Sequence, residues 1–178
     1  LPDIDIDFDD EGRNKIIEWV VNKYGKNQVA QIITYGTMAA KSSLRDTARV
    51  LDLPLMEANI LAKKMPDIKL NKLFNFDDTQ LKDKLNGEQL QMAHDFKEMA
   101  QGNDLQSKTI QQATILEGSV RNIGIHPCGV IITPDDISKF VPVTTAKDAD
   151  LLVTQFDNSV VEDAGMLKMD FLGLKNLT

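Results

Sequence analysis

The residues best suited to chemistry are three aspartates near the start of the chain. Asp3, Asp5 and Asp7 alternate with apolar residues across positions 3–8. A period of two is typical of a half-buried β-strand, so the three carboxylates share one face and the apolar side chains share the other. Successive carboxylates then lie about 7 Å apart, a spacing at which like charges repel one another. Packing alone gives no reason for this arrangement.

Two interpretations of this acidic face stay open from the residues alone. Mg²⁺ prefers oxygen ligands, and proteins hold it by one or two carboxylates together with phosphate oxygens of a substrate. Two such ions about 3.5–4 Å apart catalyse in-line phosphoryl and nucleotidyl transfer. Alternatively, the acidic face is the solvated surface of an edge strand, where charge prevents pairing with another edge.

A second pair of candidate residues lies near the other end of the chain. Lys168 and Asp170 project from one face of the apolar segment 166–172. An acid and a base at this spacing suit a third carboxylate ligand and an ammonium group that faces phosphate. A local surface ion pair is the alternative, and such a pair contributes little to stability.

The hydropathy pattern divides the chain into a strand-rich part and a helical part. Strand patterns occur at 3–8, 29–34, 129–133, 140–143, 151–156 and 166–172. Between the second and third of these, apolar residues recur at helical spacing and predict four or five helices. We therefore expect an α+β fold, a mixed sheet with helices, interrupted by an all-helical insertion. The predicted parts are residues 1–35, 36–122 and 123–178.

The net charge of the chain and the positions of its acidic residues bear on which ligands it can bind. The net charge is −7, which taken alone argues against binding nucleic acid. Six acids and no base lie in residues 1–11, however, and the other 167 residues hold 21 acids and 20 bases.

One cysteine and two histidines exclude a four-ligand Cys/His zinc site and any internal disulfide. No apolar run approaches the length of a membrane span, and the start lacks signal-peptide features.

Five sequence motifs, in order, carry a resemblance to a known family. They are PDIDIDF (2–8), ITYGTMAAKSSLRDTARVL (33–51), RNIGIHPCGVIITP (121–134), VTQFD (153–157) and KMDFLGLKNLT (168–178). Together they resemble the alpha subunits of bacterial DNA polymerase III, the C family of replicative DNA polymerases. The resemblance spans essentially the whole chain.

The resemblance implies a fold and a catalytic set. It implies a palm similar to the nucleotidyltransferase fold of DNA polymerase beta, interrupted by a helical thumb. It assigns the catalytic and metal-binding acids to Asp3, Asp5 and Asp170, and it places Lys168 beside the nucleotide's phosphates. Asp7 matches the motif but is outside this triad, although spacing alone gives it equal weight.

The resemblance also implies that the helical part grips primer-template DNA. Lys41, Arg45 and Arg49 recur every four residues, so they form one face of the first helix in that part. Such a stripe can contact successive phosphates without reading base sequence. A solvated charged face is the alternative.

The expected function is that of a fragment of a DNA-directed DNA polymerase. It would add deoxynucleoside monophosphates to a primer 3′ end with two Mg²⁺ ions, for which Mn²⁺ can substitute. Expected partners are primer-template DNA, deoxynucleoside triphosphates, the rest of the polymerase chain and other replication holoenzyme subunits. No membrane partner is expected. The expected location is the bacterial cytoplasm, at the nucleoid. The fragment alone is expected to be inactive, because the family's Gly-Ser triphosphate loop and fingers lie outside it. A two-metal nuclease or phosphodiesterase is the alternative.

Overall fold

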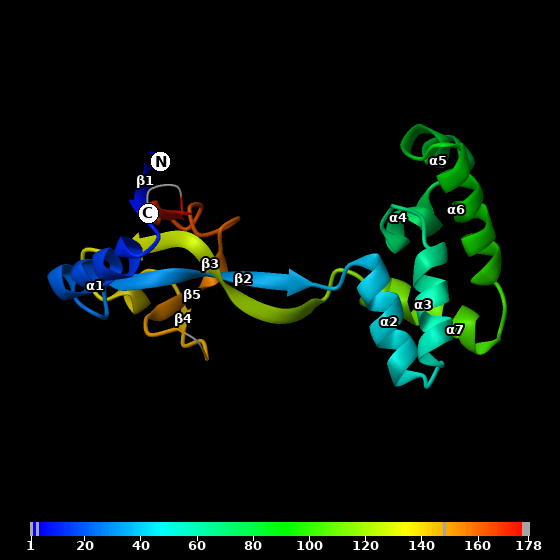
Figure 1. Cartoon of the computed structure of the whole chain (residues 1–178), viewed down its shortest axis with the longest axis horizontal. Coiled ribbons are helices and arrows are strands. Elements are labelled where there is room, and N and C mark those ends of the chain that lie inside the picture. Colours follow the sequence, from blue (N-terminus) through cyan, green and yellow to red (C-terminus); the bar gives the residue numbers. More distant parts are fainter. Residues whose placement is uncertain (1, 3, 148, 176–178) are drawn as a thin grey trace. The chain divides into compact units, whose positions relative to one another are not determined.

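The fold was obtained as a computed structural model, which describes residues 2, 4–147 and 149–175 (Figure 1). The strands are β1 (Ile4–Asp9), β2 (Val29–Thr37), β3 (Val120–Ile132), β4 (Val143–Thr144), β5 (Leu152–Asp157) and β6 (Lys168–Leu174). The α-helices are α1 (Gly12–Tyr24), α2 (Ala40–Val50), α3 (Leu55–Lys64), α4 (Leu70–Asn75), α5 (Asp78–Lys84), α6 (Gly87–Met99) and α7 (Leu105–Leu116). A short 3₁₀ helix, η1, covers Ile137–Lys139.

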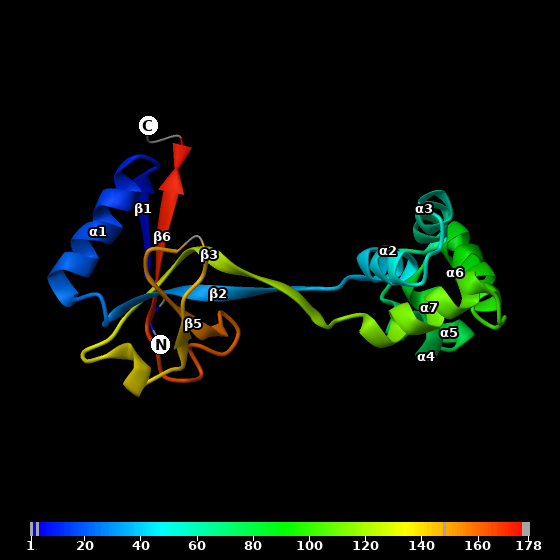
Figure 2. The same ribbon diagram turned by 90° about the horizontal axis from the view of Figure 1, so that it is seen from below.

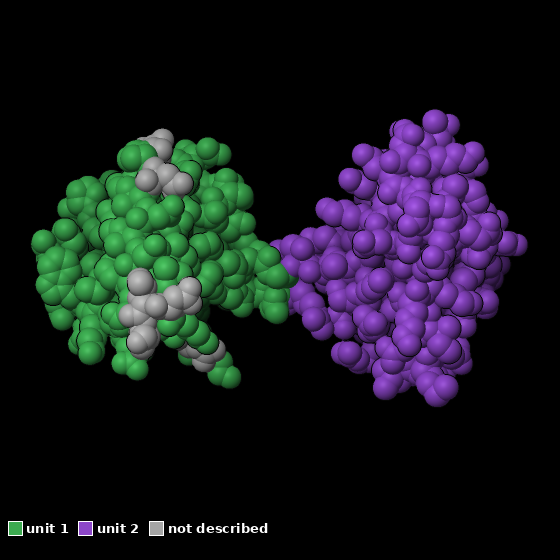
Figure 3. Space-filling model, turned by 45° about the horizontal axis from the view of Figure 1, so that its top comes forward, with its two compact units in different colours: residues 1–36, 122–178 green, residues 37–121 purple. Residues whose placement is uncertain are grey.

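The chain forms two compact units (Figure 3). The first contains residues 1–36 and 122–178, and the second contains residues 37–121. The chain therefore leaves the first unit near the end of β2 and returns to it near the start of β3.

The first unit is built on a six-stranded mixed sheet in the order β1-β6-β3-β2-β5-β4. β1 runs parallel to β6, and β2 runs parallel to β5. β3 runs antiparallel to β6, and β4 runs antiparallel to β5. A mixed sheet combined with helices confirms the predicted α+β class.

Two apolar clusters hold this sheet together. One joins α1 to the sheet through the buried residues Val20, Val21, Val29, Val130 and Phe171. The other gathers strand residues together with η1 and the segment after β5, and its buried members are Ala30, Ile32, Ile131, Ile137, Val141 and Val161. Figure 2 shows β1 and β6 side by side with α1 alongside them. On β1, Phe8 packs against this cluster, whereas Ile6 on the same face is 39% exposed.

The second unit contains six α-helices among its described residues, α2 to α7, rather than the four or five that the sequence predicted. The helix without a predicted counterpart is α4, whose 6 residues are too few to show a clear helical period. The shared core of the six helices contains thirteen buried side chains, of which Phe96, Leu44, Leu61 and Leu81 are among the largest.

Two predicted strands differ from the observed ones. β3 begins at Val120 rather than at residue 129, because its first half is an exposed segment without the apolar signal of a core strand. The segment 140–143 was predicted as a strand, but only Val143 belongs to β4, and Phe140 follows η1. Pro142 interrupts this segment, since proline cannot donate to a strand ladder.

Candidate active site

The candidate site is built where the first and last strands pair. In the parallel ladder of β1 and β6, the Cα partner of Asp5 is Asp170. Partners directly across a sheet project from the same face, so these two carboxylates share one face although they are 165 positions apart in sequence. Asp7 also lies on that face, but its partner is Leu172 rather than a polar residue. Asp3 lies outside the described residues.

The opposite face of the same two strands is apolar. The rings of Phe8 and Phe171 meet edge to face with their centroids 5.5 Å apart, and both belong to the cluster beneath α1. Offset and edge-to-face contacts of this kind add to the stabilisation that burial gives. Packing on this side fixes which way the strands face, and it leaves Asp5 exposed on the other side.

Asp170 is the most enclosed acid of the site. Its strand lies between β1 and β3, and its side chain is only 15% exposed. Its Oδ2 accepts from Nζ of Lys168 at 2.5 Å, and the Lys168 side chain is 11% exposed. Its Oδ1 is buried and has no hydrogen-bond partner among the described residues. A buried carboxylate oxygen without a partner is unfavourable, so this atom is suited to accept a cation or a donor from a ligand.

This arrangement fits a hard divalent cation. Asp170 Oδ1 offers an unpartnered oxygen, and Asp5 offers a second carboxylate from the neighbouring strand. Mg²⁺ commonly takes one or two carboxylates and completes its coordination with water and phosphate oxygens. No group of three or more His, Cys, Asp or Glu side chains close enough to hold a metal occurs among the described residues. Of the three predicted ligands, Asp5 and Asp170 lie among the described residues.

The predicted basic stripe lies on the exposed side of α2. Lys41, Arg45 and Arg49 are all exposed, but their surroundings differ. The Nε of Arg45 donates to Oδ1 of Asn59 at 3.1 Å. Arg49 lies 3.6 Å from Asp46, a carboxylate that also contacts Arg121. Neighbouring side chains thus partly engage both arginines.

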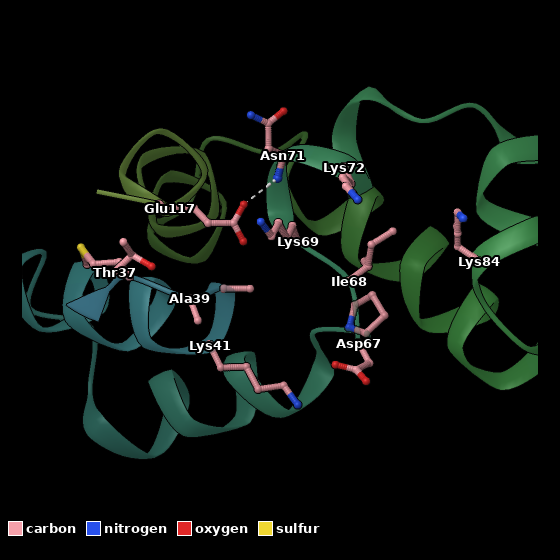
Figure 4. Close-up of a pocket in the computed structure, with 14 residues that line it drawn as sticks. Thr37, Ala39, Lys41, Asp67, Ile68, Lys69, Asn71, Lys72, Lys84 and Glu117 are labelled. Carbon is pink, nitrogen blue, oxygen red and sulfur yellow. Dashed lines mark hydrogen bonds between the residues drawn. The ribbon is translucent and has the colours of Figure 1, made fainter. Parts of the chain in front are cut away.

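Lys41 contributes instead to a pocket of about 760 Å³ within the second unit (Figure 4). Three further lysines line it, Lys69 before α4, Lys72 on α4 and Lys84 at the end of α5. None of the four ammonium groups makes a hydrogen bond or ion pair within the part of the chain that the structure describes. Four cations around one hollow create a positive potential that attracts phosphate groups.

Two acids also line this pocket, and one of them is already engaged. Glu117 accepts from the backbone N–H groups of Leu70 and Asn71 at 2.8 and 3.0 Å, the second of which Figure 4 marks. Its charge is therefore directed at the start of α4, while Asp67 remains on the pocket wall. Sequence reasoning missed the three additional lysines, because only packing brings the start of α4 and the end of α5 to the same pocket as Lys41.

No helix among the described residues has both the length and the apolar character needed to cross a lipid bilayer.

Comparison with known proteins gives a consistent result. Residues 1–173 match the family described as the bacterial DNA polymerase III alpha NTPase domain. The chain is 40% identical over 177 residues to DNA polymerase III subunit alpha of Chlamydia muridarum. The alignment covers 99% of this chain and 13% of that protein. It is 38% identical over 188 residues to the same subunit of Aquifex aeolicus, covering 100% of this chain and 16% of the relative. The DNA polymerase III subunit alpha of Pseudomonas aeruginosa is 40% identical over 181 residues, and the alignment covers 100% of this chain and 14% of that protein.

Proposed function

Because the chain belongs to the family of bacterial DNA polymerase III alpha subunits, we propose that it supplies the catalytic carboxylates of a DNA-directed DNA polymerase. The chain spans 13–16% of the length of the relatives named above, so the activity proposed is that of a whole protein containing it. That protein would transfer a deoxynucleoside monophosphate to the 3′-hydroxyl of a primer during chromosome replication and release pyrophosphate.

The in-register pair of Asp5 and Asp170 supports this function most directly. Two carboxylates on one sheet face, one with an unpartnered buried oxygen, are suited to hold Mg²⁺ against phosphate oxygens. We propose that Asp3, Asp5 and Asp170 together hold two Mg²⁺ ions, for which Mn²⁺ can substitute. When bound, these ions neutralise charge on the transferring phosphoryl group.

The proposed role of Lys168 is to bind an oxygen of the nucleotide's phosphates. Its ammonium group already contacts Asp170 Oδ2, so it lies next to the atom that would hold a metal. A metal on Asp170 would weaken the hold of the carboxylate on Lys168, and the ammonium could then also donate to an incoming phosphate. The lysine and the acid would then act on the same nucleotide.

We further propose that the first unit is the palm, with a nucleotidyltransferase fold similar to that of DNA polymerase beta, and that the second unit is the thumb. The all-helical make-up of residues 37–121 supports this division. Lys41, with the other lysines of its pocket, is proposed to contact the phosphates of primer-template DNA. Arg45 and Arg49 are proposed as weaker contributors, because Asn59 and Asp46 already engage them.

The remaining proposed partners follow from the same assignment. They are deoxynucleoside triphosphates, the rest of the polymerase chain and other subunits of the replication holoenzyme. Such an enzyme would act in the bacterial cytoplasm at the nucleoid.

The alternative of a two-metal nuclease or phosphodiesterase has less support from the site. Hydrolysis needs a group that activates water, and histidine is the usual choice. The Nδ1 of His126 accepts from the backbone N–H groups of Cys128 and Gly129, which is a turn-stabilising role. His94 lies in the second unit, 3.2 Å from Asp78.

Asparagine variants of single aspartates in the full-length polymerase test the proposal. Asp5→Asn or Asp170→Asn should lower the rate of single-nucleotide incorporation by roughly 10²-fold or more, because each removes charge that stabilises the transition state. Asp7→Asn is the matched control, since it makes the same change on the same strand face opposite Leu172. It should retain incorporation within about threefold of the unaltered enzyme.

The contrast between these variants decides the assignment. Near-normal incorporation by Asp5→Asn or Asp170→Asn would show that the carboxylate in question is not catalytic. Cleavage of DNA without nucleotide incorporation by the unaltered protein would favour the nuclease instead.

A further inference from the structure

An arginine on α1 bridges β6, the strand that carries Asp170, and the neighbouring strand β3. The Nε of Arg13 donates to the carbonyl oxygen of Phe171 at 2.7 Å, and its Nη2 donates to the carbonyl oxygen of Pro127. Phe171 directly follows Asp170 on β6, and Pro127 lies on β3. One partly buried guanidinium therefore spans from β6 to β3.

This contact lies where the strand ladder ends. Among the described residues, the antiparallel pairing of β3 with β6 extends from Ile131–Lys168 to Gly129–Asp170 and no further. Pro127 has no N–H group, so it cannot continue the ladder beyond Asp170. Arg13 supplies two donors in place of backbone pairing, and its rigid planar group fixes the distance between the two carbonyls.

The segment of β3 that receives this arginine is itself fixed in place. Nδ1 of His126 accepts from the N–H of Gly129 at 2.8 Å and from that of Cys128 at 3.3 Å. Gly129 is also tightly enclosed, because a Cβ there would lie 2.7 Å from Cδ1 of Ile32 and 3.0 Å from Nδ1 of His126. The carbonyl of Pro127 is thus a well-positioned acceptor rather than part of a loose loop.

We propose that Arg13 is a positioning residue for the metal-binding carboxylate of Asp170. This inference rests on the proposed function, since it assumes that Asp170 holds a divalent cation. The guanidinium restrains the backbone of β6 one residue beyond Asp170, at the point where β3 ceases to pair with it. Without this restraint, the backbone next to Asp170 is held less firmly, and its carboxylate is less well positioned for a cation. Residues that orient metal ligands typically change metal affinity by about 10- to 100-fold when they are removed.

Arginine variants of the full-length polymerase test this role through metal binding itself. Mn²⁺ alone is the probe, and free Mn²⁺ is followed by electron paramagnetic resonance without nucleotide or DNA. Arg13→Met should weaken Mn²⁺ binding by about 10- to 100-fold. Arg13→Lys should give an intermediate loss, because a single ammonium group cannot span both carbonyls. Lys15→Met, which removes an exposed cation from the same helix, is the control and should bind Mn²⁺ normally.

Three readouts separate a positioning role from a general structural one. The Mg²⁺ concentration that half-saturates nucleotide incorporation should rise in parallel with the loss of Mn²⁺ affinity. The Kd for primer-template DNA should stay unchanged. A lowered melting temperature of Arg13→Met accompanied by normal Mn²⁺ affinity would overturn the proposal. If Arg13→Met does not fold, the melting temperature and Mn²⁺ affinity of Arg13→Lys decide in the same way.

Asp170→Asn distinguishes failure of this inference from failure of the proposed function. Unaltered Mn²⁺ binding by Asp170→Asn would refute the metal site, and with it the role of Arg13. Weakened binding by Asp170→Asn together with unaltered binding by both Arg13 variants would keep the metal site and reject only the positioning role.

Discussion

At the scale of single residues, Lys168 and Asp170 form a largely buried ion pair within the proposed site. Both side chains are largely buried, and their charged atoms are 2.5 Å apart. A buried ion pair adds little stability compared with apolar residues, because both charges must leave water. Breaking it from one side is costly, since an uncompensated charge remains. Lys168 therefore compensates the charge of Asp170 and also belongs to the proposed nucleotide site.

The buried ion pair of Lys168 and Asp170 predicts the outcome of a double-mutant cycle on the 178-residue chain. Lys168→Met alone should lower the free energy of unfolding by about 3 kcal/mol in metal-free buffer, because Asp170 then lacks its cation. Combining it with Asp170→Asn should restore much of that loss. Urea unfolding of the two single variants and the double variant measures this coupling, and simple additivity of the losses would contradict it.

At the scale of elements, α5, α6 and α7 of the second unit are capped by polar side chains at their N-termini. Asp77 and Gln80 form a reciprocal capping box at the start of α5, and Asn86 caps α6. Asp104 caps α7 by accepting from the backbone N–H of Ser107 at 2.7 Å. Such caps satisfy N–H groups that have no partner within the helix. They allow short helices to begin at defined residues.

The cap of α7 predicts a pH dependence of stability. The Ser107 hydroxyl, followed by the Ser107 N–H, lowers the pKa of Asp104 from its usual value of 3.8. The folded state thus favours the carboxylate, so its contribution is present above pH 3.8 and is lost as the pH falls through the lowered pKa. Asp104→Asn should reduce the drop in melting temperature between pH 7 and pH 3, whereas Asp83→Asn on α5 should leave that drop unchanged. Equal drops for both variants would argue against the cap's contribution.

At the scale of the whole molecule, each unit gathers its charge from distant parts of the chain. The first unit brings together acids from its first and last strands. The second unit collects Lys41, Lys69, Lys72 and Lys84 around one pocket. A net charge of −7 therefore hides an acidic site in one unit and a basic pocket in the other. Local potential, rather than net charge, decides which ligands each unit attracts.

The basic pocket predicts how salt affects DNA binding by the full-length polymerase. Each phosphate contact adds about 0.9 to the slope of log Kobs against log salt concentration. Lys69→Gln combined with Lys72→Gln should reduce that slope by about 1 to 2. Lys63→Gln combined with Lys64→Gln removes the same charge from α3, outside the pocket, and should leave the slope unaltered. Equal effects of the two pairs would mean that the pocket is not a specific phosphate site.

The sequence by itself determined the features that depend on near neighbours in the chain. Alternation over residues 3–8 predicted a strand with one acidic face, and the structure has β1 at Ile4–Asp9 with Phe8 packed in the cluster beneath α1. Apolar residues at helical spacing likewise predicted a helical part, and its helices share a buried core that includes Leu44 and Ala48. Five ordered motifs indicated the family, which the comparisons confirm. Period and motif order can be read directly from a linear chain.

Only the tertiary structure decided the pairings between distant segments. Sequence reasoning could suggest that strands near the two ends are neighbours, but it could not give the register that places Asp5 opposite Asp170. It also missed the short helix α4, and it could not show that Arg13 joins β6 to β3. These features arise because register and side-chain contacts across a sheet are set by packing of the whole unit, including the α1 cluster that fixes which face of β1 and β6 is buried.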